Sequence, residues 1–169
     1  MQKAGPPQGR WRNVVFFLTA LLVVAADQLS KTWIRRYLPE GHSLPETGFF
    51  QLTHIQNTGA AFGLFQDQSL SLTIVALIGI IVISLLVFLF SRHFPFLSKG
   101  PGRLALGLVL GGTIGNLIDR LSLGYVTDFV DIGIWPAFNI ADSAITVGVM
   151  LFAYSLLSFT GARKTDSSA

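Results

Sequence analysis

Residues 70–90 form a run of twenty-one amino acids without a charged side chain. An α-helix of that length rises about 30 Å, which matches the hydrocarbon core of a lipid bilayer. The rest of the chain follows the same trend, because 51% of its 169 residues are hydrophobic and only 12% are charged. Soluble domains carry about 25% charged residues. The sequence therefore predicts a protein that spans a membrane.

Three further stretches are apolar enough to cross a bilayer. Residues 14–26 and 104–118 are uncharged, and residues 139–159 contain only Asp142 as a charged group. The basic start also fits a secretory signal peptide, but the helical pattern continues through Trp33 without a convincing cleavage site. We predict a membrane all-α fold, a four-transmembrane-helix bundle built as one domain of residues 1–169. Its spans are expected at about 12–36, 69–91, 103–120 and 138–160.

The basic residues are concentrated in three segments that share one side of the membrane in a four-span protein. They are Lys3, Arg10 and Arg12 before the first span, Arg92, Lys99 and Arg103 between the second and third, and Arg163 and Lys164 after the fourth. Positively charged residues favour the cytoplasmic side. We therefore expect both termini in the cytoplasm and residues 37–69 and 121–137 outside.

The first outer segment, residues 37–68, is too polar to span the membrane and contains several prolines and glycines. Within it, residues 49–55 (FFQLTHI) alternate in the manner of a β-strand. The pattern predicts a short strand or hairpin, with four aromatic side chains at the membrane interface: Phe49, Phe50, Phe62 and Phe65.

Polar side chains interrupt the apolar sequence between residues 111 and 142. Asn116, Asp119 and Arg120 end the third span, and Asn139 and Asp142 begin the fourth. Polar groups at membrane depth are costly and usually mark a functional site. Two interpretations of Arg120 remain open. It is either an interfacial arginine, paired with Asp119 or with lipid headgroups, or a donor fork for a peptide carbonyl or a phospholipid-like group.

Asp27 and Lys31 share one face of the first predicted helix, because they are four residues apart. We predict an ion pair that anchors helix packing, rather than a direct catalytic role. Ser30 is adjacent to Lys31, and consecutive helical side chains point about 100° apart. A serine–lysine nucleophile is therefore disfavoured.

Asp128, Asp131 and Asp142 are the remaining acids of the polar stretch. Two carboxylates that meet in a poorly hydrated site cannot both ionise cheaply, so the pair holds one proton. One member then activates a water, and the other protonates or stabilises a carbonyl oxygen. Asp142 also has a structural interpretation, because the helix dipole stabilises an acid in the first turn. Spacing alone does not decide between Asp128 and Asp131.

Other chemistries lack the residues that they require. The chain has no cysteine, its three histidines are scattered without an HExxH motif, and no GxSxG or phosphate-binding glycine loop occurs. We expect neither a metal nor a cofactor. The net charge of +3 comes from residues outside any aromatic-rich basic patch, so no nucleic-acid partner is expected. A GxxxG-like run from Gly111 to Gly115 indicates close helix packing.

Five segments resemble the lipoprotein signal peptidases (signal peptidase II) of bacteria, in the order typical of that family. They are DQLSK at 27–31, NTGAAF at 57–62, GGTIGNLIDR at 111–120, VTDF at 126–129 and FNIAD at 138–142. The resemblance implies a four-helix bundle with a small extracytoplasmic β-cradle between the first two helices. It also implies an aspartic endopeptidase of the bacterial cytoplasmic (inner) membrane. Such an enzyme removes signal peptides from diacylglyceryl-modified prolipoproteins, cutting just before the lipidated cysteine.

The same resemblance implies roles for individual residues. Asp128 and Asp142 correspond to the catalytic dyad. Substrate-binding positions are Asn57, Gly59, Asn116, Arg120 and Asn139, and structural support comes from Asp27, Lys31 and Asp119. The expected partners are prolipoprotein substrates and membrane lipids. We expect a monomer whose active site lies near the outer face of the membrane.

Two functions other than proteolysis would use some of the same residues. A small transporter would use Asp27, Lys31 and Asp119 as a charge relay, but polar residues do not recur through all four spans. A lipoprotein-binding scaffold would share the binding residues and lack cleavage.

Overall fold

The structure, a computed structural model, describes residues 8–59, 68–90, 97 and 100–166. The elements in chain order are helix α1 (Gln8–Tyr37), strands β1 (Ser43–Leu44) and β2 (Gln51–Asn57), helix α2 (Ser69–Leu85) with a π-helical turn (Leu86–Phe90), helix α4 (Gly100–Leu123), strand β3 (Val126–Asp131) and helix α5 (Ile140–Asp166). Within the described residues, four helices are long and apolar enough to cross a membrane: Asn13–Tyr37, Ser69–Phe90, Gly100–Leu123 and Ile140–Thr160. The prediction of four such helices is confirmed.

Some residues named in the sequence analysis lie outside the described part of the chain. These are Lys3, Phe62, Phe65, Arg92 and Lys99, together with residues 60–62 of the NTGAAF segment. The side chains of Arg10, Arg12, Arg163 and Lys164 also fall outside it.

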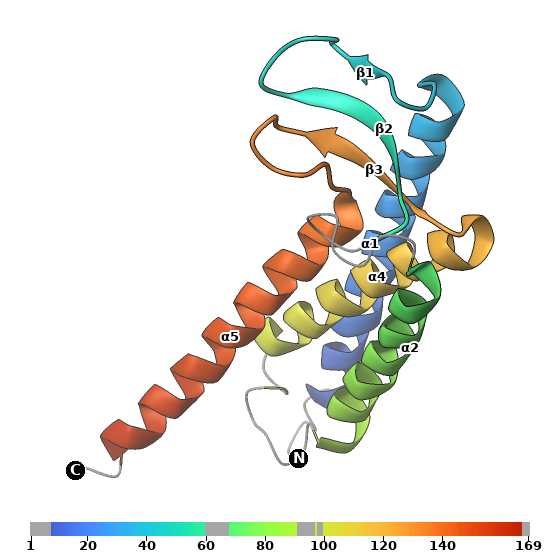
Figure 1. Ribbon diagram of the computed structural model, residues 1–169. Coiled ribbons are helices and arrows are strands. Elements are labelled where there is room, and N and C mark those ends of the chain that lie inside the picture. The colour runs from blue at the N-terminus through green and yellow to red at the C-terminus, as the bar shows by residue number, and fades with distance from the viewer. Residues whose placement is uncertain (1–7, 60–67, 91–96, 98–99, 167–169) are drawn as a thin grey trace, which may run out of the picture.

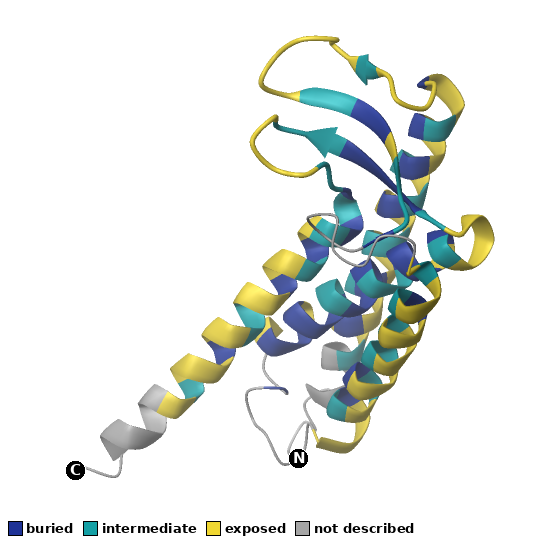
Figure 2. Cartoon of the chain, viewed as in Figure 1, coloured by how far each residue is buried: buried dark blue, intermediate teal, exposed yellow. Residues whose placement is uncertain are grey.

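Helix α4 lies at the centre of the bundle and packs against α1, α2 and α5 (Figure 1). In the most apolar stretch of α4, 56% of the residues are buried inside the protein. The corresponding shares in α1, α2 and α5 are 22%, 17% and 22%. The outward faces of these three helices are exposed (Figure 2) and carry large apolar side chains such as Leu21, Ile78 and Leu157. An exposed apolar surface of this extent suits a lipid environment.

Small residues bring the backbones of the helices together. A Cβ atom added to Gly111 of α4 would lie 2.7 Å from the carbonyl oxygen of Ala20 in α1, and one added to Gly115 would lie 2.6 Å from Asp27 Oδ2. Gly112, on another face of α4, leaves equally little space against Ala141 of α5. The GxxxG-like run therefore serves close helix packing, as predicted.

A small antiparallel sheet with the strand order β1-β2-β3 lies at the end of the bundle opposite to the start of α1 and the end of α5 (Figure 1). Strand β2 confirms the strand predicted within residues 37–68. Strand β3, which the sequence analysis did not predict, comes from the connection between α4 and α5. Ile55 of β2 pairs with Asp128 of β3, and Asn57 pairs with Val126. This register makes Asn57 a diagonal neighbour of Asp128 on one face of the sheet.

Candidate active site

Asp128 lies in strand β3 and is only 2% exposed. Both of its carboxylate oxygens accept hydrogen bonds from amide side chains. Asn57 Nδ2 donates to Oδ2 at 2.8 Å, and Asn139 Nδ2 donates to Oδ1 at 2.7 Å. The amide of Asn57 is held in this orientation because its oxygen accepts the Gly59 N–H at 2.9 Å. The amide of Asn139 is held in the same way by the Asp142 N–H, also at 2.9 Å.

Asp142 lies in the first turn of α5 and exchanges hydrogen bonds with Asn139. The Asn139 N–H donates to Asp142 Oδ2 at 3.2 Å, and Asn139 Oδ1 accepts the Asp142 N–H. This reciprocal pair is a capping box with asparagine and aspartate in the two positions. Asn116 Nδ2 of α4 donates to the other oxygen of Asp142 at 2.8 Å. Asp142 therefore stabilises the start of α5 and also presents its carboxylate beside Asp128.

The pKa of Asp128 is raised to about 7, first by burial and then by the charge of Asp142. The hydrogen bonds from Asn57 and Asn139 and the charge of Lys31 act in the opposite direction. Near neutral pH, Asp128 can thus take up or release a proton. This behaviour is what a pair of carboxylates that shares one proton requires.

Lys31 and Asp27 form the ion pair that their spacing predicted. Lys31 Nζ lies 2.8 Å from Asp27 Oδ2, and both side chains are fully buried. Lys31 also lies 3.5 Å from Asp119 Oδ2 and donates a 2.9 Å hydrogen bond to Asn116 Oδ1. Asp27 Oδ1 accepts the Ala141 N–H at 3.0 Å, which ties α1 to the start of α5.

Asp119 connects this cluster to strand β3. Its Oδ2 accepts the Thr127 N–H at 3.0 Å, and its Oδ1 lies 3.4 Å from Arg35 Nη1. Arg35 also donates to Thr127 Oγ1 at 2.9 Å. Asp119 and Arg35 thereby fix the residue that precedes Asp128 from two sides.

Arg120 forms no ion pair with Asp119 in the described part of the chain, so the predicted pairing of these two residues was wrong. Among the described residues, the ion pairs of Asp119 are those with Lys31 and Arg35. Arg120 instead lines a cavity, where its Nη2 donates to the Gly59 carbonyl oxygen at 3.2 Å. Its buried Nε atom has no hydrogen-bond partner in the described part of the chain.

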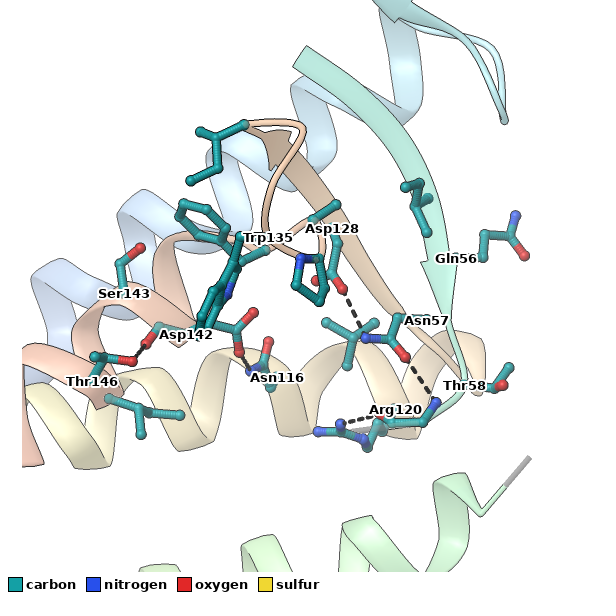
Figure 3. Close-up of a pocket in the computed structure, with 18 of the residues that line it drawn as sticks. Gln56, Asn57, Thr58, Asn116, Arg120, Asp128, Trp135, Asp142, Ser143 and Thr146 are labelled. Carbon is teal, nitrogen blue, oxygen red and sulfur yellow. Dashed lines mark hydrogen bonds between the residues drawn. The ribbon is translucent and has the colours of Figure 1, made fainter. Parts of the chain in front are cut away.

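The cavity has a volume of about 850 Å³ and contains the carboxylates of both Asp128 and Asp142 (Figure 3). Asn57, Gly59, Asn116 and Arg120 also line it. Its apolar wall comes from the β3–α5 connection and from α5: Ile132, Trp135, Pro136, Ala137, Phe138, Ile145 and Val147. Asn139 does not line the cavity, because it is fully buried behind the two aspartates. Asp131 lies outside it as well, and its Oδ1 accepts the Gly133 N–H at 2.7 Å in a turn.

Several residues of this region were missed by the sequence analysis. Trp135 and Thr58 line the cavity, and Gln28 Nε2 donates to Asp27, Asp119 and the Gly115 carbonyl. Arg35 was missed too. The only sequence signal for Trp135 was its position, because it is a large aromatic residue between the two candidate aspartates. Gln28 lies within the DQLSK segment itself, where its polarity in an apolar helix was the available signal.

Membrane enzymes of bacteria share this arrangement of helices and sheet. One solved bacterial membrane enzyme matches with a TM-score of 0.75 at 33% identity, covering 86% of this chain and 88% of that chain. A second matches with a TM-score of 0.71, also at 33% identity, over 84% of this chain and 92% of the other. The chain thus has the fold of a polytopic membrane enzyme.

Sequence comparison narrows this class to one family. The family described as signal peptidase (SPase) II matches residues 19–158. The lipoprotein signal peptidase of Dehalococcoides mccartyi strain BAV1 is 50% identical over 139 residues, which is 82% of this chain and 86% of that protein. That of Moorella thermoacetica is 47% identical over 143 residues, 84% and 92% of the two chains. The chain belongs to the signal peptidase II family of membrane proteases.

Proposed function

We propose that this protease is an aspartic endopeptidase that removes signal peptides from diacylglyceryl-modified prolipoproteins, cutting just before the lipidated cysteine. The observation that carries the proposal is the pairing of Asp128 and Asp142 in one cavity, each held by amide donors. The relatives are named as lipoprotein signal peptidases, and this substrate class is carried over from them.

The chemistry follows from one proton shared by the two carboxylates. The ionised carboxylate removes a proton from a water, whose oxygen attacks the carbonyl carbon of the scissile peptide bond. The protonated carboxyl donates its proton to the carbonyl oxygen. The tetrahedral intermediate then collapses: one of its hydroxyl groups returns a proton to the carboxylate that had protonated the carbonyl oxygen, the C–N bond breaks, and the carboxyl formed by the first step protonates the departing amine. One water is consumed, and the pair again holds one proton.

The polar residues on the cavity wall are suited to bind the peptide. Asn57, Gly59 and Asn116 present amide or backbone groups there, and Arg120 is the donor fork for a substrate carbonyl. For Asn139 we propose a positioning role, because it contacts both aspartates from behind the cavity. Asp27, Lys31 and Asp119 support these residues from the interior of the bundle.

The position of the cavity beside the outward face of α5 supports a substrate that is held in the membrane. Part of its wall is formed by Ser143, Thr146 and Val147, which are exposed on the outward face of α5. A substrate chain held in the bilayer can reach such a site laterally between lipid and protein. We place the protein in the bacterial cytoplasmic membrane with both termini in the cytoplasm and the active site near the outer face, on the distribution of lysine and arginine.

The test compares aspartate-to-asparagine substitutions on and off the cavity. Asp128→Asn and Asp142→Asn should each abolish cleavage of a lipidated prolipoprotein by purified protein, while Asp131→Asn on the same strand as Asp128 retains it. A folded Asp128→Asn or Asp142→Asn variant with full activity would refute the dyad. Equal cleavage of lipidated and unlipidated substrate would refute the proposed substrate class.

A further inference from the structure

Lys31 contacts the candidate active site through a single amide group. Its ammonium donates to Asn116 Oδ1 at 2.9 Å, and Asn116 Nδ2 donates to Asp142 Oδ1 at 2.8 Å. The two ends of one side chain therefore join a fully buried cation to a candidate catalytic carboxylate. The ion pair with Asp27 does not require this contact, since Asp27 binds Lys31 on its own at 2.8 Å.

An asparagine amide can turn by 180° and exchange its oxygen with its nitrogen at almost no change in shape. If Asn116 turned, its NH2 group would face the ammonium of Lys31, and its oxygen would face the carboxylate of Asp142. Both contacts would become repulsive. A charged partner makes a hydrogen bond about twice as strong as a neutral one, so Lys31 and a carboxylate at Asp142 both oppose this turn, and of the two only Lys31 does so independently of the proton that the pair shares.

A second donor acts on the same oxygen more weakly. Asn139 Nδ2 lies 3.2 Å from Asn116 Oδ1, but the same nitrogen also donates to Asp128 at 2.7 Å and lies 3.4 Å from the Thr127 carbonyl. Its two hydrogens are divided among three acceptors. Of the two donors to the Asn116 oxygen, Lys31 is therefore the stronger.

We propose that Lys31 is a positioning residue for the carboxylate pair, which acts by holding the Asn116 amide in the orientation that donates to Asp142. Hydrogen bonds from such a donor favour the ionised form of a carboxylate. Through Asn116 and through its own charge, which lowers the pKa of Asp128, Lys31 thus favours the ionised carboxylate that the pair needs as its base. The inference rests on the proposed aspartic mechanism and adds a function to a residue otherwise expected to support packing alone.

The charges around this contact define which variants are informative. Lys31 is faced by Asp27 from its own helix and by Asp119 from α4. Asp142 is faced by Asp128 from β3, and Arg120 from α4 lines the same cavity. Replacing Lys31 alone would leave Asp27 as an uncompensated buried charge, which is strongly destabilising. Lys31 and Asp27 should therefore be replaced together.

The experiment compares Asp27→Asn with the double variant Asp27→Asn/Lys31→Met. The single variant keeps the Lys31–Asn116 contact, whereas the double variant loses it and keeps the net charge of the wild type. The single variant should be the less stable one, because a new amide NH2 must face either Lys31 or the Ala141 N–H. A purely structural role of Lys31 therefore predicts that the single variant is also the less active.

The positioning role predicts the reverse order of activity. The double variant should have a kcat about tenfold lower than the single variant, with KM changed by less than about twofold, as expected for a weakened transition-state contact. The acid limb of its pH–kcat profile should lie about one pH unit higher, as expected for a lost interaction with a nearby opposite charge. Coincident profiles, or an activity that follows stability, would overturn the proposal.

A measurement without substrate covers the case in which neither variant cleaves. The free energy of unfolding is then compared between pH 4 and pH 8, where it reports proton uptake by the folded pair. The two variants should differ in this dependence, and the difference should become smaller when Asn116→Ser is added to both, because only the direct effect of the Lys31 charge on Asp128 is then left. Equal dependence, or a difference that Asn116→Ser leaves unchanged, would refute the contact. Activity of Asp128→Asn or Asp142→Asn would instead refute the proposed function itself.

Discussion

Replacing Asp128 with asparagine should abolish cleavage and, at pH 8, increase the stability of the protein. The pKa of Asp128 is raised from 3.8 to about 7 in the folded state. Between these two values the folded protein binds more protons than the unfolded chain, so stability decreases as the pH rises through this window. A difference of about three pKa units corresponds to about 4 kcal/mol of stability lost by pH 8.

The asparagine side chain avoids this loss because it carries no charge at any pH. It has its own cost, since its NH2 group must face the amide donor of either Asn57 or Asn139. Leaving such buried donors unpaired costs about 1–3 kcal/mol. The variant Asp128→Asn should therefore be about 1–3 kcal/mol more stable than the wild type at pH 8, and less stable by a similar amount at pH 4.

Denaturant titration of the purified protein at pH 4 and pH 8 measures both differences. The change of sign between the two pH values is the decisive observation, because the cost of the unpaired donor is the same at both. Asp131→Asn, which places the same substitution on the same strand outside the cavity, serves as the control. A difference between Asp128→Asn and the wild type that is equal at pH 4 and pH 8 would refute the account of Asp128.

Three further predictions follow from single contacts. Gly115→Ala should lower the free energy of unfolding by about 1–3 kcal/mol, because its Cβ atom would lie 2.6 Å from Asp27 Oδ2; Gly79→Ala, where nothing lies within 4 Å, is the control and should not destabilise the protein. In Asn57→Ala the pKa of Asp128 should rise above about 7, since a hydrogen bond that lowers it is lost. The alkaline limb of the pH–kcat profile should then move to higher pH, and a shift to lower pH would contradict the proposed proton sharing. Arg120→Lys should raise KM by roughly tenfold with a smaller effect on kcat, because an ammonium lacks the planar fork of a guanidinium; an unchanged KM in steady-state assays would exclude a substrate contact.

Much of the architecture was predictable because it depends on composition and spacing along one chain. Uncharged runs long enough to cross a bilayer predicted four helices, and the helical spacing of Asp27 and Lys31 predicted their ion pair. The resemblance to signal peptidase II selected Asp128 over Asp131. The cavity is consistent with that choice, since Asp128 lines it and Asp131 does not.

The sequence analysis failed where a contact depends on the way in which distant segments meet. Asp119 and Arg120 are adjacent in sequence, yet they contact different parts of the protein. Asp119 pairs with Lys31 of α1, whereas Arg120 donates to the backbone of Gly59. Consecutive side chains of a helix point about 100° apart, and only the packing of α4 between its neighbours decides what each one meets. Strand β3 was missed for a related reason, because its pairing partner β2 lies about seventy residues earlier in the chain.

The sequence by itself determined that this protein crosses a membrane with four helices and that its polar residues are concentrated in a few segments. Hydrophobicity and helical period are local properties, so they can be read without knowing the fold. The tertiary structure alone decided that Asn57, Asn116 and Asn139, from three separate segments, direct their amides at two carboxylates. The orientation of an amide is set by the partners of both its ends, and those partners are brought together only by the packed helices and sheet.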